Sequence, residues 1–268
     1  AEFQVGLNSG KAAEGLGMAW SLHLGDCLEY LRTLPDGSVD AVVTDPPYSS
    51  GGMVRGDRMM STRDKYQRSD VLTEFASFTG DNRDQRGFAY WCALWLSEAR
   101  RIAKPGAMLC IFTDWRQLPT TTDAIQAGGW VWRGIVPWDK VVARPMPGRF
   151  RAQAEYMVWG TNGPRDVSTE GEPAYGVGVF RHSTTPTAER EHSTQKPEEL
   201  LKDIIAVACP RDTTVLDPFA GSGTTGVAAI RMGRNFIGCE ISPEYHAIAT
   251  RRLKEAEQAD GLYAGAAK

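Results

Sequence analysis

Short apolar runs alternate with amphipathic segments along most of the chain. Residues 39–44 form an almost wholly apolar run, Val-Asp-Ala-Val-Val-Thr, which is typical of a strand buried on both faces of a parallel sheet. Between residues 88 and 102 apolar side chains recur at helical spacing, and a Lys-Pro-Gly run at 104–106 ends that predicted helix. Its Trp and Phe residues are expected in the core.

The same reading predicts further elements. Strands are expected at residues 21–24, 108–112, 130–136, 156–159, 213–216 and 235–239, and helices at 27–34, 119–127, 197–209, 222–232 and 243–258. Because strands and helices alternate, the fold class is predicted to be α/β, with a doubly wound, mostly parallel sheet. Ligands of such sheets bind beyond the carboxyl ends of the strands, so functional residues are expected directly after strands.

Two long stretches lack such a pattern. Residues 49–87 are polar without a clear period, and a stretch of that length inside a domain is usually functional or mobile. Residues 161–191 are loop-like, and the Ala/Gly-rich tail from residue 259 is expected to fray. A chain of 268 residues is long enough for one domain spanning 1–268 with a modest insert.

Composition narrows the class of protein. With 42% hydrophobic and 24% charged residues the chain is typical of a globular protein. No apolar stretch reaches the length of a membrane span and no signal peptide is evident, so we expect a cytoplasmic protein without membrane association. The five cysteines include no Cys-x-x-Cys pair and the four histidines show no ligand spacing. Neither a disulfide framework nor a metal site is expected.

The net charge of −3 does not indicate nucleic-acid binding, but the basic residues are unevenly distributed. Five lie between residues 49 and 69, and four more between 139 and 151. Either group could be an ordinary solvated loop. Because both stretches flank the candidate active site described below, we take them as candidate DNA contacts. They are Arg55, Arg58, Arg63, Lys65, Arg68, Lys140, Arg144, Arg149 and Arg151.

A glycine-rich turn follows the predicted strand 213–216. Its sequence is Asp-Pro-Phe-Ala-Gly-Ser-Gly-Thr-Thr at residues 217–225. Glycines at 221, 223 and 226 satisfy G-x-G-x-x-G, and Glu240 follows about twenty residues later, as in a dinucleotide fingerprint. The turn lies too near the end of the chain for a second mononucleotide half, and Asp-Pro-Phe is foreign to the NAD fingerprint. No lysine follows the glycines, which excludes a P-loop.

Glycines in this turn would let a cofactor approach the backbone closely, where a side chain would block it. Glu240 is expected at the end of the next strand, placed to accept hydrogen bonds from two ribose hydroxyls. The alternative for Glu240 is a solvated carboxylate at a strand end. The turn as a whole predicts a site for an adenosyl cofactor.

Asp45-Pro46-Pro47-Tyr48 follows the buried strand 39–44. The amino group of a nucleobase is a weak nucleophile because its lone pair is delocalised into the ring. The Asp45 carboxylate and the Pro46 carbonyl could both accept from that NH₂ and orient its lone pair toward a methyl donor. Pro47 would stiffen the turn, and Tyr48 would offer a flat face for a flipped base. The alternative is a strand-ending turn with a surface tyrosine.

With these motifs in place, the chain resembles the S-adenosylmethionine-dependent DNA amino-methyltransferases over most of its length. His192-Ser193-Thr194-Gln195-Lys196-Pro197 is similar to the family's His-x-Thr-Gln-Lys-Pro cofactor segment, and Leu24-Gly25-Asp26-Cys27 to its early Gly-Asp element. The helix ending in Lys104-Pro105-Gly106 and the Trp138-Asp139-Lys140 run resemble further family blocks. The resemblance implies cofactor contacts by Asp26, Cys27, His192, Thr194, Lys196, Asp217, Phe219, Gly221, Ser222, Gly223, Thr224 and Glu240.

The order of the motifs, catalytic first and cofactor-binding last, resembles the beta class, a circular permutation of the Rossmann-like methyltransferase sheet. The resemblance places target recognition between the motifs, here in a small insert at 141–191, and makes 49–87 a candidate DNA-contacting loop. Aspartate at position 45 resembles the adenine-N6 enzymes more than most cytosine-N4 enzymes. Cytosine-C5 chemistry is excluded, because none of the five cysteines follows a proline.

The expected function is therefore transfer of a methyl group from S-adenosylmethionine to N6 of a flipped adenine in duplex DNA, as in restriction-modification systems. Two alternatives stay open: an N4-cytosine enzyme of the same fold, and a catalytically silent DNA-binding regulator. A homodimer and a cognate restriction nuclease are partners that the resemblance leaves open.

Overall fold

The structure, a computed structural model, describes residues 20–48, 84–143, 145, 147–165, 175–185 and 195–266, with side chains described up to residue 259. Within these ranges eight strands form a single sheet in the order β1-β8-β7-β2-β3-β5-β4-β6. The strands are β1 Trp20–Leu24, β2 Val39–Thr44, β3 Ala103–Thr113, β4 Val131–Asp139, β5 Ala154–Thr161, β6 Phe180–Arg181, β7 Thr214–Asp217 and β8 Asn235–Glu240. Only β5 runs antiparallel to its neighbours, β3 and β4. The predicted doubly wound, mostly parallel sheet is confirmed.

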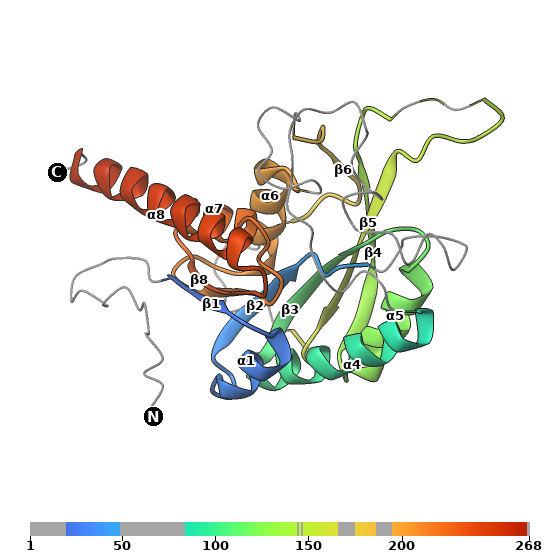
Figure 1. Cartoon of the computed structure of the whole chain (residues 1–268), viewed down its shortest axis with the longest axis horizontal. Helices are drawn as coiled ribbons and strands as arrows, with labels where there is room; N and C mark the ends of the chain where they lie inside the picture. The colour runs from blue at the N-terminus through green and yellow to red at the C-terminus, as the bar shows by residue number, and fades with distance from the viewer. Residues whose placement is uncertain are drawn as a thin grey trace.

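Helices cover both faces of the sheet (Figure 1). The helices are α1 Cys27–Thr33, α4 Gln85–Ile102, α5 Leu118–Ala127, α6 Glu198–Ala208, α7 Thr224–Arg231 and α8 Pro243–Ala266. Contacts join α1 to α4 and α4 to α5 on one face, and α6 to α7 and α7 to α8 on the other. None of the helices in the described ranges is long and apolar enough to cross a membrane.

The central strand β2 contributes to the core on both sides of the sheet. Ala41 and Val43 belong to the cluster beneath α6–α8, whereas Val42 belongs to the cluster beneath α1, α4 and α5. Successive side chains of a strand point to opposite faces, so a strand covered on both faces must be apolar throughout. The predicted core stripe of α4 is likewise buried, including Trp95 at 0% exposure.

The structure corrects three expectations about element boundaries. β3 begins at Ala103, before the Lys-Pro-Gly run, because Ala103 already pairs with Val39 across a bulge. The segment expected to be a loop at 161–191 contains the short strand β6, which pairs with the end of β4. The tail expected to fray from residue 259 continues α8 to Ala266.

Within the range 141–191, residues 154–161 form β5 and residues 180–181 form β6, and both strands belong to the sheet. The other described residues of this range are 141–143, 145, 147–153, 162–165, 175–179 and 182–185.

Candidate active site

Two strands bring the catalytic and cofactor motifs together. β2 and β7 are parallel neighbours, with Ala41 opposite Val215 and Val42 opposite Leu216. The turns that follow them therefore lie at the same edge of the sheet. The hydroxyl of Thr44, the last residue of β2, donates to Oδ1 of Asp217, the last residue of β7, at 2.6 Å.

A cavity of about 550 Å³ opens at this edge. It is continuous from the turn after β2 to the turn after β8, so catalytic and cofactor candidates line one space. The lining residues expected from the sequence are Asp26, Cys27, Asp45, Pro46, Pro47, Tyr48, Lys140, Lys196, Asp217, Phe219, Gly221, Ser222, Thr224 and Glu240. The cavity also lies where the sheet's chain order reverses, between β7 and β2, which is the position expected for the ligand of a doubly wound sheet.

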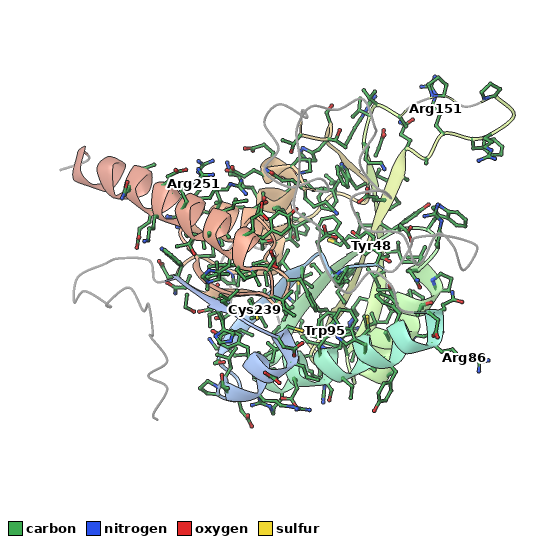
Figure 2. The ribbon with its side chains drawn as sticks, in the orientation of Figure 1. Tyr48, Arg86, Trp95, Arg151, Cys239 and Arg251 are labelled. Atoms are coloured by element: carbon green, nitrogen blue, oxygen red, sulfur yellow. The ribbon has the colours of Figure 1, made fainter. Side chains whose placement is uncertain are left out.

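Other expected residues lie elsewhere. Gly223 does not line the cavity, and its missing Cβ instead makes room for Ala249 of α8, 2.9 Å from an ideal Cβ. Arg149 and Arg151 lie on the β4–β5 connection, which projects from the body of the protein (Figure 2). Arg55, Arg58, Arg63, Lys65, Arg68, Arg144, His192 and Thr194 fall outside the described residues.

Glu240, at the end of β8, lies in a network of backbone hydrogen bonds. Its Oε2 accepts from the backbone N–H of Gly221 and its Oε1 from that of Ser242, both at 2.8 Å. Burial raises the pKa of this carboxyl, although these backbone donors oppose the shift. The backbone N–H of Ile241 is a third donor to this carboxylate. Because a carboxylate has about four lone pairs, Glu240 is fixed in place and can still accept from a ligand hydroxyl.

The three glycines of the fingerprint have different physical roles. An ideal Cβ at Gly226 would lie 2.6 Å from Leu253 and 2.7 Å from Phe236, so this glycine allows α7 to pack against β8 and α8. Gly221 has a φ of +53°, and its missing Cβ meets open space. Close approach of a cofactor was expected to explain all three glycines, but only Gly221 has that role open to it. The other two are explained by packing.

Asp217 is buried between these motifs. It accepts from the Thr44 hydroxyl and, at 3.0 Å, from the backbone N–H of Phe219. Burial raises its pKa from 3.8 to about 6, and the hydrogen bonds only partly offset that effect. Asp217 thus fixes the turn that begins the glycine loop and couples it to the catalytic strand.

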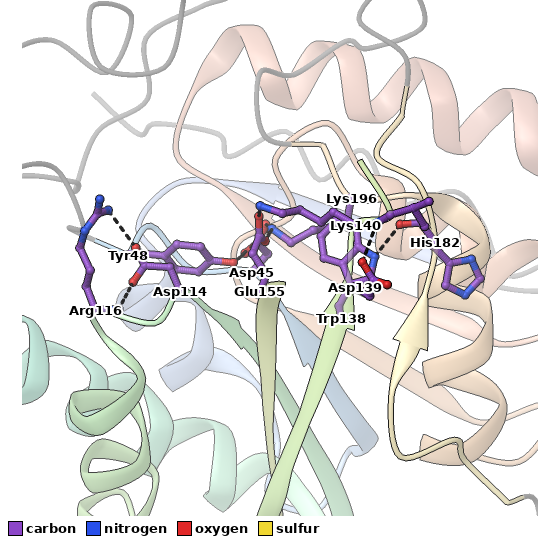
Figure 3. Close-up of polar contacts among 11 residues, drawn as sticks. Asp45, Tyr48, Asp114, Arg116, Trp138, Asp139, Lys140, Glu155, His182 and Lys196 are labelled. Carbon is purple, nitrogen blue, oxygen red and sulfur yellow. Dashed lines mark hydrogen bonds and ion pairs between the residues drawn. The ribbon is translucent and has the colours of Figure 1, made fainter. Parts of the chain in front are cut away.

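In the catalytic half of the cavity, hydrogen bonds and ion pairs between side chains fix the position of Asp45 (Figure 3). Oδ1 of Asp45 accepts from the hydroxyl of Tyr48, and Oδ2 accepts from Nζ of Lys196 at 2.5 Å. Nζ of Lys196 also donates to the Tyr48 hydroxyl at 3.1 Å. The Lys196 ammonium further lies 5.4 Å from the centre of the Tyr48 ring and 5.1 Å from that of Phe112, within cation–π range.

These contacts set the protonation of the cluster. Burial raises the pKa of Asp45, and Lys196 and Tyr48 oppose that shift. Burial lowers the pKa of Lys196, but its neighbours Asp45 and Glu155 outweigh that effect and raise it overall. The ammonium therefore stays charged although only 6% of the side chain is exposed.

Glu155, on β5, was missed in the sequence. Its Oε2 lies 3.3 Å from Nζ of Lys196, and its Oε1 accepts from Nζ of Lys140 at 3.3 Å. The two lysines outweigh burial and lower its pKa. The available signal was a carboxylate at the start of an otherwise apolar strand, Ala-Glu-Tyr-Met-Val-Trp.

Aromatic side chains form the remaining walls. Trp91 of α4 packs against Phe219 with ring centres 5.3 Å apart, and Trp115, which follows β3, lines the cavity with 59% of its surface exposed. Arg116 lies 5.2 Å from the centre of the Trp115 ring. Such flat apolar faces suit a purine or pyrimidine ring. Trp91 and Trp115 were also missed in the sequence.

The arrangement provides a partly buried carboxylate beside aromatic faces, joined to a glycine loop with a buried carboxylate. No group of three His, Cys, Asp or Glu side chains in the described ranges could hold a metal ion. The geometry suits two organic ligands, one carrying a ribose and the other an amino group.

Comparison with known proteins identifies the family. The family model described as DNA methylase, for the N6/N4 methyltransferases, matches residues 39–251, from β2 to α8. The chain belongs to this N6/N4 DNA methylase family. The family depends on S-adenosylmethionine as methyl donor.

Two relatives extend over most of this methylase. The type II methyltransferase M2.DpnII of Streptococcus pneumoniae is 30% identical over 247 residues, covering 85% of this chain and 87% of the relative. The type II methyltransferase M.HinfI of Haemophilus influenzae is 29% identical over 260 residues, covering 86% and 67% respectively.

Solved structures share the fold of this methylase. The M1.HpyAVI complex with S-adenosylmethionine has a TM-score of 0.62 and 24% identity, covering 87% of this chain and 98% of that one. The cytosine-N4-specific PvuII DNA methyltransferase has a TM-score of 0.66 and 19% identity, covering 94% and 95%. At these identities the likeness concerns the fold alone.

Proposed function

We propose that the protein transfers a methyl group from S-adenosylmethionine to the exocyclic N6 of an adenine turned out of duplex DNA. The single observation that carries this proposal is the cavity continuous from Asp45 to Glu240. It joins an amine-binding carboxylate to a ribose-binding carboxylate. Cofactor and target base would thus meet in one cavity.

The cofactor half fits S-adenosylmethionine by its donor set. Glu240 would accept from the ribose through the lone pair that its three backbone donors leave. The open space at Gly221 would admit the ligand against the backbone, and Phe219 would offer an aromatic wall. Asp26, which caps α1 through the N–H groups of Leu28 and Glu29, lies beside the end of β8. Bound S-adenosylmethionine supplies the methyl group: a C–N bond forms as the C–S bond breaks, the electron pair stays on sulfur, and the amine releases a proton.

In the catalytic half, Asp45 would accept a hydrogen bond from the target amino group, together with the backbone carbonyl of Pro46. Two acceptors on one NH₂ orient the nitrogen lone pair away from them and toward the methyl donor. Tyr48, fixed through its hydroxyl, would stack on the flipped base. Because the pKa of Asp45 is raised by burial, this carboxylate is also suited to receive the proton that the amine loses.

DNA would approach over the β4–β5 connection. Lys140 at its base lines the cavity, and Arg149 and Arg151 lie farther out on the same connection. Positive side chains at these positions would neutralise phosphates of the duplex, which makes binding dependent on salt. Residues 49–87 and the non-sheet parts of 141–191 are the further candidates for contact with DNA.

Aspartate at position 45 favours adenine over cytosine as the target base, because an aspartate there resembles the motif of the adenine-N6 enzymes. The cytosine-N4 alternative has a specific observation behind it, because a cytosine-N4-specific enzyme is among the structures that share the fold. Both reactions use the same methyl donor, so only the methylated base distinguishes them.

The test is methyl transfer from labelled S-adenosylmethionine to duplex DNA, followed by digestion to nucleosides and mass analysis. We expect N6-methyladenine, and activity reduced about a thousandfold in Asp45→Ala. Asp36→Ala, which removes an exposed aspartate paired with Arg101, is the matched control. N4-methylcytosine would establish the alternative base, and absence of transfer by the wild type would support the silent regulator. Wild-type activity in Asp45→Ala would reject the catalytic role.

A further inference from the structure

Both oxygens of the catalytic carboxylate already accept from this protein's own side chains. Oδ1 of Asp45 accepts from Tyr48 and Oδ2 from Lys196. Each oxygen has a second lone pair for a target amino group, but the Lys196 ammonium draws on the same negative charge and weakens the carboxylate as an acceptor. Release of Lys196 from Asp45 would therefore strengthen the hydrogen bond from Asp45 to the base.

Of the two donors to Asp45, Lys196 has a second carboxylate, that of Glu155, within reach. Oε2 of Glu155 is buried and accepts no hydrogen bond within the described part of the chain. It nevertheless faces Nζ of Lys196 as an ion pair at 3.3 Å. A small change in the Lys196 torsions would turn this longer ion pair into a hydrogen bond. The other oxygen of Glu155 is held by Lys140, which fixes the direction of the free one.

The charge balance also favours such a shift. An ammonium as buried as that of Lys196 would be costly to leave without a carboxylate partner. Moving from Asp45 to Glu155 keeps it paired throughout. The aromatic rings of Tyr48 and Phe112 lie 5.4 and 5.1 Å from Nζ and stabilise the cation beside the two carboxylates.

We propose that Lys196 caps the catalytic carboxylate in the free protein and shifts onto Glu155 when the target amino group arrives. Glu155 is then a positioning residue for methyl transfer, acting through Lys196 without touching the base. This inference rests on the proposed function. The inference goes beyond that function because it assigns Lys196 two alternative carboxylate partners, Asp45 and Glu155. Glu155 belongs to none of the sequence motifs.

The sign of a pH effect follows from the charges around Asp45. The charged or titratable groups that face it or its immediate neighbours are Lys196, Tyr48, Glu155, Asp217, Lys140 and Asp114. Glu155 raises the pKa of Asp45, whereas Lys196 lowers it. Glu155→Gln should therefore move the acid limb of the kcat/KM profile to lower pH, and Lys196→Met should move it to higher pH.

The test is a double-mutant cycle on the full chain with S-adenosylmethionine and substrate duplex. Without Glu155, Lys196 has only Asp45 as its carboxylate partner, so we expect Glu155→Gln to lower kcat/KM about tenfold, with unchanged affinity for S-adenosylmethionine. In the Lys196→Met background the same substitution should have no further effect. Glu155→Asp, which keeps the charge, should recover part of the loss.

Glu198→Gln is the matched control. Glu198 is also paired with two cations, Arg231 and Lys202, but does not line the cavity. An equal loss from Glu155→Gln in both backgrounds, or an acid limb that stays in place, would overturn the inference. Those outcomes require an active wild type. Absence of transfer by the wild type would instead overturn the proposed function and this inference with it.

Discussion

The two halves of the cavity are built from different kinds of contact. Around the glycine loop, backbone N–H groups of Gly221, Ser242 and Phe219 hold the carboxylates of Glu240 and Asp217. Around Asp45, the contacts are between side chains: the Tyr48 hydroxyl from the same turn, and the Lys196 ammonium from a distant part of the chain. Lys196 and Asp45 are separated by 151 positions in the sequence.

This difference has a consequence for ligand binding. Contacts to the backbone are fixed by the fold, so the glycine-loop half can meet a cofactor without rearrangement. In the charged half, each carboxylate is already paired with a lysine ammonium, which competes with an incoming donor for the carboxylate's charge. The comparison predicts that changes in the first half alter stability or cofactor affinity, whereas changes in the second alter turnover and its pH dependence.

The largest effect expected in the glycine-loop half concerns Asp217. Its folded pKa of about 6 lies above the ordinary 3.8, so the folded protein binds this proton more tightly than the unfolded chain does. That stabilisation is fully present below about pH 4 and is lost as pH rises through about 6. The change amounts to about 3 kcal/mol. Asp217→Asn cannot titrate, so the wild type should lose about this much unfolding free energy relative to the variant between pH 4 and 7.

Chemical denaturation at a series of pH values measures this difference. Glu198→Gln provides a control of opposite sign, because Lys202 and Arg231 outweigh burial and lower the pKa of Glu198. For that residue the wild type should gain relative to the variant as pH rises. Parallel stability curves for the wild type and Asp217→Asn would show that burial of Asp217 is not the dominant contribution.

The sequence alone could predict the glycine-loop half of the site better than the charged half. The strand 39–44, the glycine turn and Glu240 were predictable because each is encoded locally, by an apolar run followed directly by its functional residues. A local pattern of this kind also predicted the two-sided burial of β2 and the core stripe of α4. The position of each motif at a strand's carboxyl end followed from the fold class.

Glu155 and the partner of Lys196 could not be predicted, because both depend on tertiary pairing. Glu155 reaches the cavity only because β5 runs antiparallel between β3 and β4, a register that no local pattern specifies. Lys196 was grouped with the cofactor residues by resemblance, whereas its ammonium lies against Asp45. Gly223 was likewise assigned to the cofactor, whereas its missing Cβ makes room for Ala249 of α8.

A smaller effect is expected from Glu240. Glu240→Gln keeps one acceptor oxygen but replaces the other with an amino group, so it loses both a backbone bond and the charge. A hydrogen bond to a charged group contributes about 1.5–3 kcal/mol, which predicts S-adenosylmethionine binding weaker by roughly 10- to 100-fold in calorimetry. The exposed Glu244, in the first turn of α8, supplies the matched control Glu244→Gln. Unaltered affinity in Glu240→Gln would reject the ribose role.

The smallest effect is expected outside both halves, at the β4–β5 connection. Arg149→Ala and Arg151→Ala should each weaken duplex binding only a few-fold and equally for all sequences, because a phosphate contact carries no base information. The slope of log affinity against log salt should become shallower by about one for each residue removed. Arg251→Ala on α8, where Arg251 pairs with Glu255, is the control and should leave the slope unchanged. Fluorescence anisotropy with a labelled duplex at several salt concentrations measures both the affinity and its salt dependence. An unchanged slope in the Arg149 and Arg151 variants would show that the β4–β5 connection does not bind DNA.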